Sequence, residues 1–355
     1  MKVTSLSSFP DFIPSGRSES VHLDKNENPF AVPPSPLEEI REAFLNVPMN
    51  RYPDQDYRAL KESLSDYTGY SSEKIVLGNG GDEVLWILYA AFVEAARPVL
   101  TLSPCFSEYD RLCSVFRTEQ LRLPLDCSGS GFALDGEKLL KLAKERDPAL
   151  IIIDSPNNPS GMTIEKDIIL ELVYQVSCPV IIDEAYGEFA DTTILEKFRG
   201  SRMPSNLFIL KTLSKAWGLA GIRLGYGLCE EEVANRFNSI RSPFNISVLT
   251  EEVARVMLRY REWMESRVYS IKFMRDRFIQ SVNTIHGWKA FPSDSNFVLV
   301  NTCFELPLVK TSMEENQIEL RYPELPEYDG NWIRISVGKE EEMRRLLDII
   351  SSIGK

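Results

Sequence analysis

Lys215 is the side chain whose type and position most directly suggest covalent chemistry. It follows an apolar run at residues 207–210 that predicts a buried strand, with the hydroxyl of Ser214 before it and Arg223 after it. An amine in this position could form a Schiff base with a carbonyl compound, while the hydroxyl and the guanidinium hold a phosphate. Because a lone loop lysine is more often only solvated, this interpretation depends on what the rest of the chain places beside it.

A glycine-rich loop between a predicted strand and a predicted helix is a candidate anion site. It has the sequence Gly-Asn-Gly-Gly-Asp-Glu at residues 78–83, and Gly80, Gly81 and Asp82 stand where the helix would begin. Consecutive glycines let the backbone approach a ligand closely, and the free amides of a helix start favour an anion. The spacing is not that of a dinucleotide-binding loop, and Asp82 could be only a helix N-cap.

Two further motifs follow apolar strands. Asn158 lies in Ser-Pro-Asn-Asn-Pro-Ser-Gly (155–161), and Asp183 ends the apolar run 180–182. A plain turn and a helix N-cap would explain them without chemistry. However, open α/β sheets bind ligands at the carboxyl ends of their strands, and a poorly solvated carboxylate needs a cationic partner such as a protonated pyridine nitrogen. Tyr186 could reach the same ligand with its hydroxyl.

Two arginines near the C-terminus are candidates for binding an anion. Arg334 lies in the alternating run Trp-Ile-Arg-Ile-Ser-Val at residues 332–337, and Arg321 lies in a weaker run of the same kind at 319–323. An arginine within such a strand is either a solvent-facing edge charge or an anion clamp.

The elements that must position these residues alternate between strand and helix, which predicts an α/β fold with a largely parallel sheet covered on both faces. After about residue 230 the pattern changes to charged helical stretches with a break near 242–245, followed by short strands and a final helix at 340–353. The seven strands predicted for the sheet are 74–77, 99–102, 119–125, 150–154, 179–183, 207–210 and 223–228.

This pattern predicts that the chain is divided into three parts. We expect residues 1–45 to form an N-terminal arm and part of a small domain, residues 46–240 a large ligand-binding domain, and residues 241–355 a small α+β domain. Within the arm, Asp-Lys-Asn-Glu-Asn-Pro at residues 24–29 predicts a dense turn.

Composition excludes several classes of function. The net charge of −12 argues against nucleic acid or an anionic membrane as a partner. No apolar stretch is long enough for a membrane span, and the N-terminus lacks the apolar core of a signal peptide. The six cysteines are scattered without a CxxC pair, which predicts reduced thiols of a cytoplasmic protein. With two histidines in the sequence, we expect no metal site.

Taken in order, these motifs resemble the fold-type I, pyridoxal-phosphate-dependent aminotransferases, over about residues 23–353. Within that group the chain resembles the histidinol-phosphate aminotransferases most. The matching segments are 23–29, 50–54, 155–161, 183–189, 211–226 and 334–338.

This resemblance implies pyridoxal 5′-phosphate as the cofactor, carried by Lys215 as a Schiff base. Lys215 would then shuttle a proton on the substrate, and Asp183 would keep the ring nitrogen protonated. Tyr186 and Asn158 would bind the phenolic oxygen of the ring. The other implied cofactor contacts are to the phosphate or to the ring face, from Gly80, Gly81, Asp82, Ser214, Arg223 and Phe106.

The resemblance also implies the substrates and the assembly. Tyr52 would reach the cofactor phosphate of a second subunit, which makes the enzyme a homodimer with shared active sites. The small-molecule substrates would be an amino donor and a 2-oxo acid, namely L-histidinol phosphate and 2-oxoglutarate, as in histidine biosynthesis. Arg334 and Arg321 would grip the donor's phosphate, with Asn158 beside them.

Two positions depart from the pattern of this family. Phe106 replaces the commoner ring-stacking tyrosine, and Phe12 stands where the family usually has a tyrosine near the substrate phosphate. Both changes concern the substrate and not the cofactor. An aromatic amino acid aminotransferase and a threonine-phosphate decarboxylase therefore stay open as alternatives, while the intact cofactor residues argue against a catalytically silent binding module.

Overall fold

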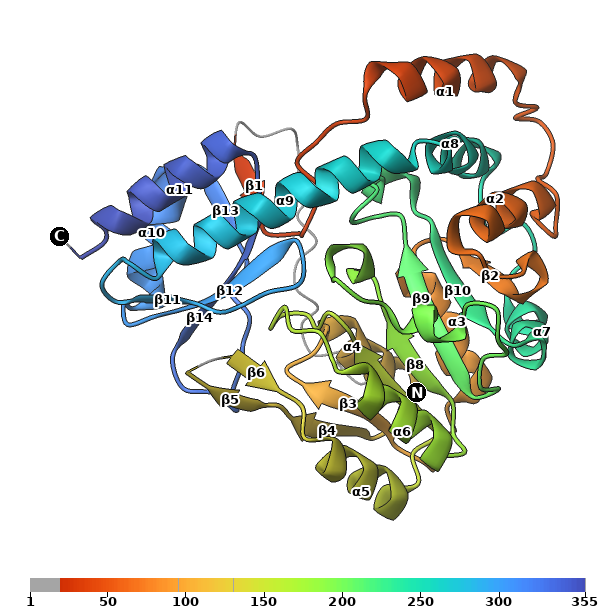
Figure 1. Cartoon of the computed structure of the whole chain (residues 1–355), viewed down its shortest axis with the longest axis horizontal. Helices are drawn as coiled ribbons and strands as arrows, with labels where there is room; N and C mark the ends of the chain where they lie inside the picture. The colour runs from red at the N-terminus through yellow and green to blue at the C-terminus, as the bar shows by residue number, and fades with distance from the viewer. Residues whose placement is uncertain (1–19, 95, 130, 355) are drawn as a thin grey trace, which may run out of the picture.

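Seven strands form one sheet at the centre of the larger part of the chain (Figure 1). The computed structural model describes residues 20–94, 96–129 and 131–354. Strand β10 runs antiparallel to both of its neighbours, and the other strands run parallel to one another, so the predicted sheet is confirmed. The order across the sheet is β2 (Ile75–Gly78), β10 (Gly225–Cys229), β9 (Leu207–Thr212), β8 (Val180–Asp183), β7 (Leu150–Asp154), β3 (Val99–Ser103) and β4 (Gln120–Pro124).

Alternate residues of the central strands face two different cores. In β8, Val180 and Ile182 enter one core and Ile181 enters the other. Because both faces are covered, these strands are apolar along their whole length. Helices α2 (Arg58–Thr68), α5 (Gly136–Arg146), α6 (Lys166–Gln175) and α8 (Val248–Leu258) contribute to the first core, and α3 (Gly81–Phe92), α4 (Ser107–Phe116) and α7 (Glu231–Ile240) to the second.

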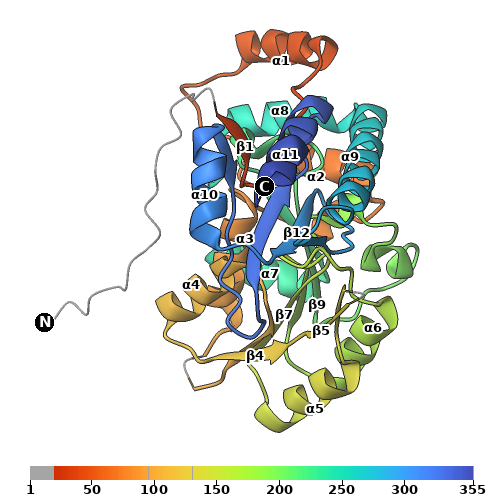
Figure 2. The same ribbon diagram turned by 90° about the vertical axis from the view of Figure 1, so that its left-hand side faces the viewer.

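The C-terminal part has a smaller sheet and a core of its own. Helix α9 (Arg261–Val282) connects the two parts: Met264 and Ile271 pack into the first large core, whereas Phe278 packs into the small one. Figures 1 and 2 show this helix running from one part to the other. The small part comprises β11 (Trp288–Ala290), β12 (Phe297–Thr302), β14 (Asn331–Ser336), α10 (Leu306–Glu315), α11 (Glu340–Ser352) and the parallel pair β1 (Val21–Leu23) and β13 (Ile318–Leu320).

The predicted helical stretch after residue 230 is interrupted twice. The predicted break near 242–245 is confirmed, and a second break at Arg259 and Tyr260 was not predicted. At the second break the Tyr260 hydroxyl hydrogen-bonds Glu39 and lies 3.2 Å from the Ser35 Oγ, both on α1 (Pro34–Asn46). Among the described residues, no helix has the length and apolar character needed to cross a membrane. The division into three parts stays a prediction.

The ends of five strands meet along one edge of the large sheet. Gly225 pairs with Gly78 on one side and with Thr212 on the other. Asp183 pairs with Asp154 further along the same edge. The loops at this edge carry the candidate residues, with Arg223 in the loop that joins β9 to β10, as expected for a ligand site at the carboxyl edge of an α/β sheet.

Candidate active site

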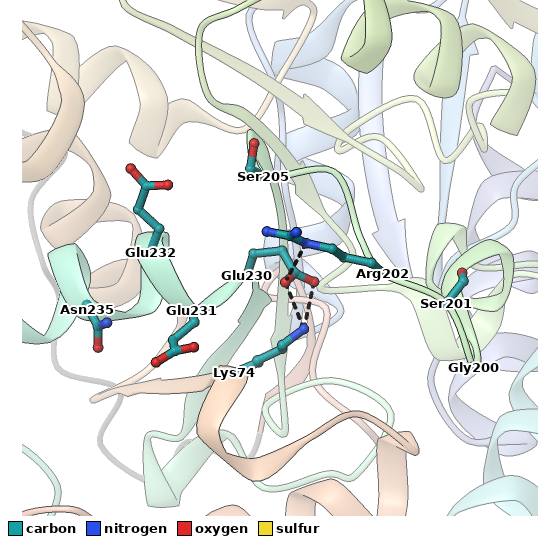
Figure 3. Close-up of a pocket in the computed structure, with 9 residues that line it drawn as sticks. All are labelled: Lys74, Gly200, Ser201, Arg202, Ser205, Glu230, Glu231, Glu232 and Asn235. Atoms are coloured by element: carbon teal, nitrogen blue, oxygen red, sulfur yellow. Dashed lines mark hydrogen bonds and ion pairs between the residues drawn. The ribbon is translucent and has the colours of Figure 1, made fainter.

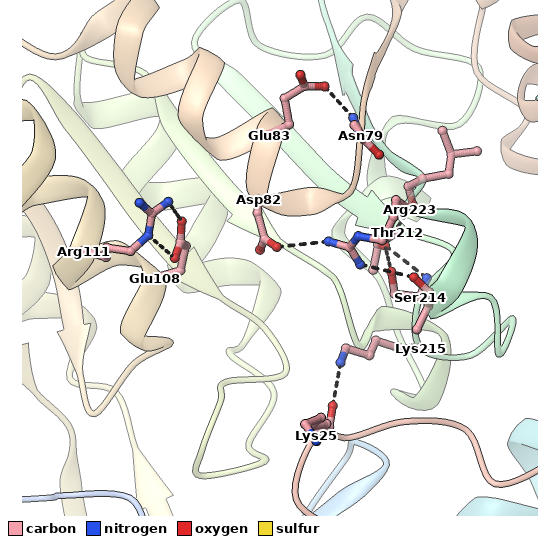
Figure 4. A network of polar contacts seen from close by, with 12 residues as sticks. Lys25, Asn79, Asp82, Glu83, Glu108, Arg111, Thr212, Ser214, Lys215 and Arg223 are labelled. Carbon is pink, nitrogen blue, oxygen red and sulfur yellow. Dashed lines mark hydrogen bonds and ion pairs between the residues drawn. The ribbon is translucent and has the colours of Figure 1, made fainter. Parts of the chain in front are cut away.

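Lys215 lies just beyond the end of β9 and points toward the N-terminal segment. Its Nζ donates a hydrogen bond to the backbone carbonyl of Lys25 at 3.0 Å (Figure 4). The same Nζ lies 5.7 Å from the centre of the Tyr186 ring. The amine is therefore directed at the same edge of the sheet as the other candidate residues, and its hydrogen bond goes to a neutral carbonyl.

The glycine loop and Arg223 are packed tightly together. Gly80 has φ +87°, a conformation that side chains of L-residues rarely adopt, and a Cβ placed there would lie 2.6 Å from Nη2 of Arg223. The Arg223 Nη2 also lies 3.2 Å from Oδ2 of Asp82 (Figure 4). Gly81 begins α3, so the free backbone amides of this helix start face the region that holds the arginine.

The hydroxyl of Ser214 belongs to the same cluster. Its Oγ accepts a hydrogen bond from Oγ1 of Thr212 at 3.0 Å, and its side chain is buried. Together, a guanidinium, a hydroxyl and a helix start provide the donors that a phosphate group requires.

Asp183 is a buried carboxylate without a cationic partner. The Tyr109 hydroxyl donates to its Oδ2 at 2.8 Å, and the backbone amide of Ala185 donates to its Oδ1 at 3.0 Å. The second contact closes a turn and is not a helix N-cap, because the short 3-10 helix Gly187–Phe189 begins only after Tyr186. Burial raises the pKa of Asp183 to about 6, because among the described residues no ion pair offsets the loss of solvation. A ligand with a positive charge would relieve this cost.

Asn158 and Arg334 are brought into direct contact. Nη1 of Arg334 donates to the Asn158 Oδ1 at 2.7 Å, and Nη2 donates to the carbonyl of Asp24 at 2.6 Å. The buried Nε of Arg334 has no hydrogen-bond partner. A guanidinium carries five N–H donors and these two bonds use two of them, so the group retains donors for an additional acceptor.

Arg321 lies beside Arg334 through a pair of backbone hydrogen bonds. The Arg321 amide donates to the Arg334 carbonyl at 3.2 Å, and the Arg334 amide donates back at 2.7 Å. Burial lowers the pKa of Arg334, and the neighbouring charge of Arg321 lowers it further. Because directly opposed residues of an antiparallel pair project from the same face, these two arginine side chains favour the binding of an anion there.

Phe106 and Tyr52 are the two predicted aromatic contacts. Phe106 lies just before α4, half-buried, with its ring centre 5.7 Å from that of Tyr109 in an edge-on arrangement. Tyr52 is 81% exposed and stacks on Phe244, with 4.7 Å between the ring centres. The structure thus places Tyr52 on the surface of the chain. Phe12 lies outside the described residues.

Three residues of the site were missed by sequence reasoning. Tyr109 donates to Asp183, and its position three residues after Phe106, in the helix that Phe106 precedes, was the available signal. Asp154 ends β7 as Asp183 ends β8, and burial raises its pKa to about 7, so the argument applied to Asp183 would have identified it. Asn26, whose side chain donates to the Tyr186 hydroxyl at 2.9 Å, lay within the predicted turn but was given no role.

A cavity lies at the opposite end of the strands, beside the start of β2 and the end of β10 (Figure 3). It has a volume of about 840 Å³ and surrounds the buried carboxylate of Glu230. That carboxylate accepts hydrogen bonds from Lys74 at 2.7 Å, Tyr70 at 3.0 Å and the amide of Met203 at 3.1 Å. Because these contacts satisfy Glu230 within the chain, we assign the cavity a structural role only.

One group of side chains has the spacing of metal ligands, although the sequence showed no such pattern. Ligand atoms of His22, Asp24 and Glu319 lie within 4.8 Å of one another. His22 and Glu319 already contact each other at 3.0 Å. Strands β1 and β13 place His22 and Glu319 opposite each other, which the sequence alone could not reveal.

The cluster fits pyridoxal phosphate on three independent observations. Asp183 is buried without a cation and would be matched by a protonated ring nitrogen. Gly80 leaves no room for a side chain in front of Arg223, so that the loop forms a cradle of backbone amides. The primary amine of Lys215 would supply the nucleophile for the aldehyde.

Comparisons with known proteins agree with this cluster. Residues 18–350 match the family described as aminotransferase class I and II. A histidinol-phosphate aminotransferase of Ruminiclostridium cellulolyticum is 31% identical over 352 residues, covering 98% of this chain and 97% of the relative. Another from Thermococcus gammatolerans is 34% identical over 333 residues, covering 94% and 92%. A crystal structure of the Sinorhizobium meliloti enzyme in complex with pyridoxal-5′-phosphate has a TM-score of 0.84 at 25% identity, covering 99% of this chain and 100% of that one.

Proposed function

Because this chain belongs to the class I and II aminotransferases, and within them to the histidinol-phosphate aminotransferase family, we propose that it transfers the amino group of L-histidinol phosphate to 2-oxoglutarate. The products are imidazole-acetol phosphate and L-glutamate. The observation that carries this proposal is the arginine pair. Arg334 retains unused donors, Arg321 is paired with it, and Asn158 binds Arg334 from the loop that follows β7.

The cofactor of this family is pyridoxal phosphate, which supplies a conjugated cationic ring that delocalises the electrons left on a substrate carbon when its proton is removed. In our proposal the Lys215 amine removes and returns that proton. The carboxylate of Asp183, held by the Tyr109 hydroxyl, keeps a proton on the ring nitrogen. Asn158 and Tyr186 bind the phenolic oxygen.

The remaining cofactor contacts position the ring and the phosphate. Phe106 lies against the ring face, where its apolar surface also limits access of water. The phosphate group has a preformed set of donors at the start of α3 and around Arg223. The residues proposed to hold it are Gly80, Gly81, Asp82, Ser214 and Arg223.

The arginine pair is proposed to select the substrates. The phosphate ester of the donor offers several oxygens, which suits two adjacent guanidinium groups. In the other half-reaction, the distal carboxylate of glutamate would occupy the same pair. Since Arg334 also binds Asn158, the position of the substrate anion is tied to a residue that contacts the cofactor.

A homodimer with shared active sites is part of the proposal. Tyr52 is 81% exposed, and Leu45 and Met49 on the same segment are 81% and 67% exposed. A second copy of the chain would cover these apolar side chains. The partner subunit's Tyr52 would then reach the cofactor phosphate. We also propose a cytoplasmic location, on the ground that all six cysteines are unpaired thiols.

The proposal is tested by a competition between two amino donors, histidinol phosphate and phenylalanine, with 2-oxoglutarate as acceptor. We expect a clear preference for histidinol phosphate. Arg321→Ala should lower kcat/KM for histidinol phosphate by about 10- to 100-fold, as for the loss of a charge-assisted contact, and should affect phenylalanine much less. A preference for phenylalanine would support an aromatic aminotransferase instead, and release of CO₂ from threonine phosphate would support a decarboxylase.

A further inference from the structure

The N-terminal segment 24–28 contacts each of the three residues around which the site is built. The Lys25 carbonyl accepts from the Lys215 amine at 3.0 Å, and the Asp24 carbonyl accepts from Arg334 at 2.6 Å. The third contact differs in kind, because it comes from a side chain. The amide Nδ2 of Asn26 donates to the Tyr186 hydroxyl at 2.9 Å.

Asn26 is held in place by buried polar groups on two sides. It is 1% exposed, and its backbone has φ +54°, in the left-handed region that asparagine tolerates better than most residues. Its backbone amide donates to the Oγ of Ser336 at 2.8 Å, and its carbonyl accepts from Nδ2 of Asn296 at 2.9 Å. The position of its side chain is therefore determined by the fold.

Hydrogen bonds also determine which way the Asn26 amide faces. The Ser336 Oγ accepts from the Asn26 backbone amide and has one proton of its own, which it donates to the Asn26 Oδ1 at 3.1 Å. Oδ1 is thus the acceptor end and Nδ2 faces Tyr186, the orientation that gives the Ser336 proton an acceptor. Since Nδ2 can only donate, the Tyr186 oxygen accepts this bond.

A consequence follows for the proton of the Tyr186 hydroxyl. Because Asn26 has no acceptor on that side, the proton cannot point toward it and remains available to another acceptor. The charged groups that face Tyr186 are the Lys215 amine, 5.7 Å from its ring centre, and the guanidinium of Arg334. In their charged forms both groups only donate hydrogen bonds, so neither can accept the Tyr186 hydroxyl proton. The hydroxyl is left to donate to a ligand.

We propose that Asn26 is a positioning residue that directs the Tyr186 hydroxyl proton toward the phenolic oxygen of the cofactor. The inference rests on the proposed function, in which Tyr186 binds that oxygen. It also gives the turn at residues 24–29 a role. The turn contacts Tyr186 on one side and β14 on the other, where Ser336 and Arg334 project from the same face. Arg334, proposed to bind the substrate, and Tyr186, proposed to bind the cofactor, are therefore both held by this turn.

The test is a double-mutant cycle between Asn26 and Tyr186, read as the dissociation constant of pyridoxal phosphate for the reconstituted protein. Asn26→Gly removes the amide and suits the left-handed backbone. We expect it to weaken binding by about tenfold in the wild-type background and by less than about twofold in Tyr186→Phe. Asn28→Ala is the matched control, because Asn28 lies in the same segment but donates to the Ala216 carbonyl at 2.9 Å. Its effect should be the same in both backgrounds.

A second variant tests the direction of the proton. Asn26→Asp keeps the size of the side chain but places an acceptor opposite Tyr186. It should therefore weaken cofactor binding more than Asn26→Gly does, and shift the pH midpoint of the cofactor's absorbance change upward by about one unit. Equal losses for Asn26→Gly in both backgrounds, or an Asn26→Asp variant with wild-type affinity and midpoint, would overturn the inference. Failure of the wild-type protein to bind pyridoxal phosphate would instead refute the proposed function.

Discussion

Replacing Asp183 by asparagine should stabilise the cofactor-free protein while impairing the cofactor-bound one. Burial raises the pKa of Asp183 from 3.8 to about 6. At about 1.36 kcal/mol per pKa unit, holding the ionised carboxylate in this site costs about 3 kcal/mol. Asparagine carries no charge; its carbonyl oxygen can accept from the Ala185 amide, and its NH2 group can donate to the Tyr109 oxygen.

The pH dependence of this effect has a definite sign. The native state holds the Asp183 proton more tightly than the unfolded state does, so stability falls as pH rises from about 4 to about 6. We expect Asp183→Asn to unfold at higher urea concentration than the wild type at pH 8, by about 3 kcal/mol, with about half of that gain at pH 5. Asp167→Asn, which changes an exposed carboxylate, serves as the control and should show no gain.

Addition of pyridoxal phosphate should reverse the order of stability. The wild-type carboxylate then pairs with a ring cation, whereas asparagine cannot, so saturating cofactor should raise the urea midpoint of the wild type much more than that of the variant. The reasoning would be refuted if Asp183→Asn were no more stable than the wild type at pH 8 without cofactor. It would equally be refuted if cofactor stabilised both proteins to the same extent.

Three further substitutions test other parts of the account. Lys211→Met should lower the free energy of unfolding, measured in urea, by about 3–5 kcal/mol. The reason is that it leaves the buried carboxylates of Glu184 and Glu188, 3.3 and 3.2 Å from the amine, without their cation. Tyr109→Phe should weaken pyridoxal phosphate binding about tenfold or more by removing a hydrogen bond to the charged Asp183, and an unchanged dissociation constant would contradict this. Gly80→Ala should weaken cofactor binding measured by absorbance titration, because its methyl group would displace Arg223; wild-type affinity would show that the loop relaxes instead.

Much of the large sheet was predictable because its strands are continuous apolar runs. Residues 150–154 and 180–182 could only be buried on both faces, and the polar residues that follow such strands mark the carboxyl edge. Lys215 and Asp183 were found in this way. The comparisons establish the family, whereas the roles given to single residues stay proposals.

The contacts between distant segments could not be predicted from local patterns. Asn26 and Tyr186 are 160 positions apart, and Arg334 reaches Asn158 across 176. Such pairs depend on how the small sheet packs against the large one. The spacing of apolar residues along the sequence carries no information about that packing. The break at Arg259 and Tyr260 is a further example, because neither glycine nor proline marks it in the sequence.

The central claim is that Lys215 carries the cofactor, and reduction with borohydride tests it most directly. Purified protein incubated with pyridoxal phosphate, reduced and digested should yield one modified peptide, with the pyridoxyl group on Lys215. Lys215→Ala should yield no specific adduct, while Lys25→Ala, which keeps the backbone carbonyl that the amine contacts, should be labelled like the wild type. An unlabelled wild-type protein, or a label located on a different lysine, would contradict the account.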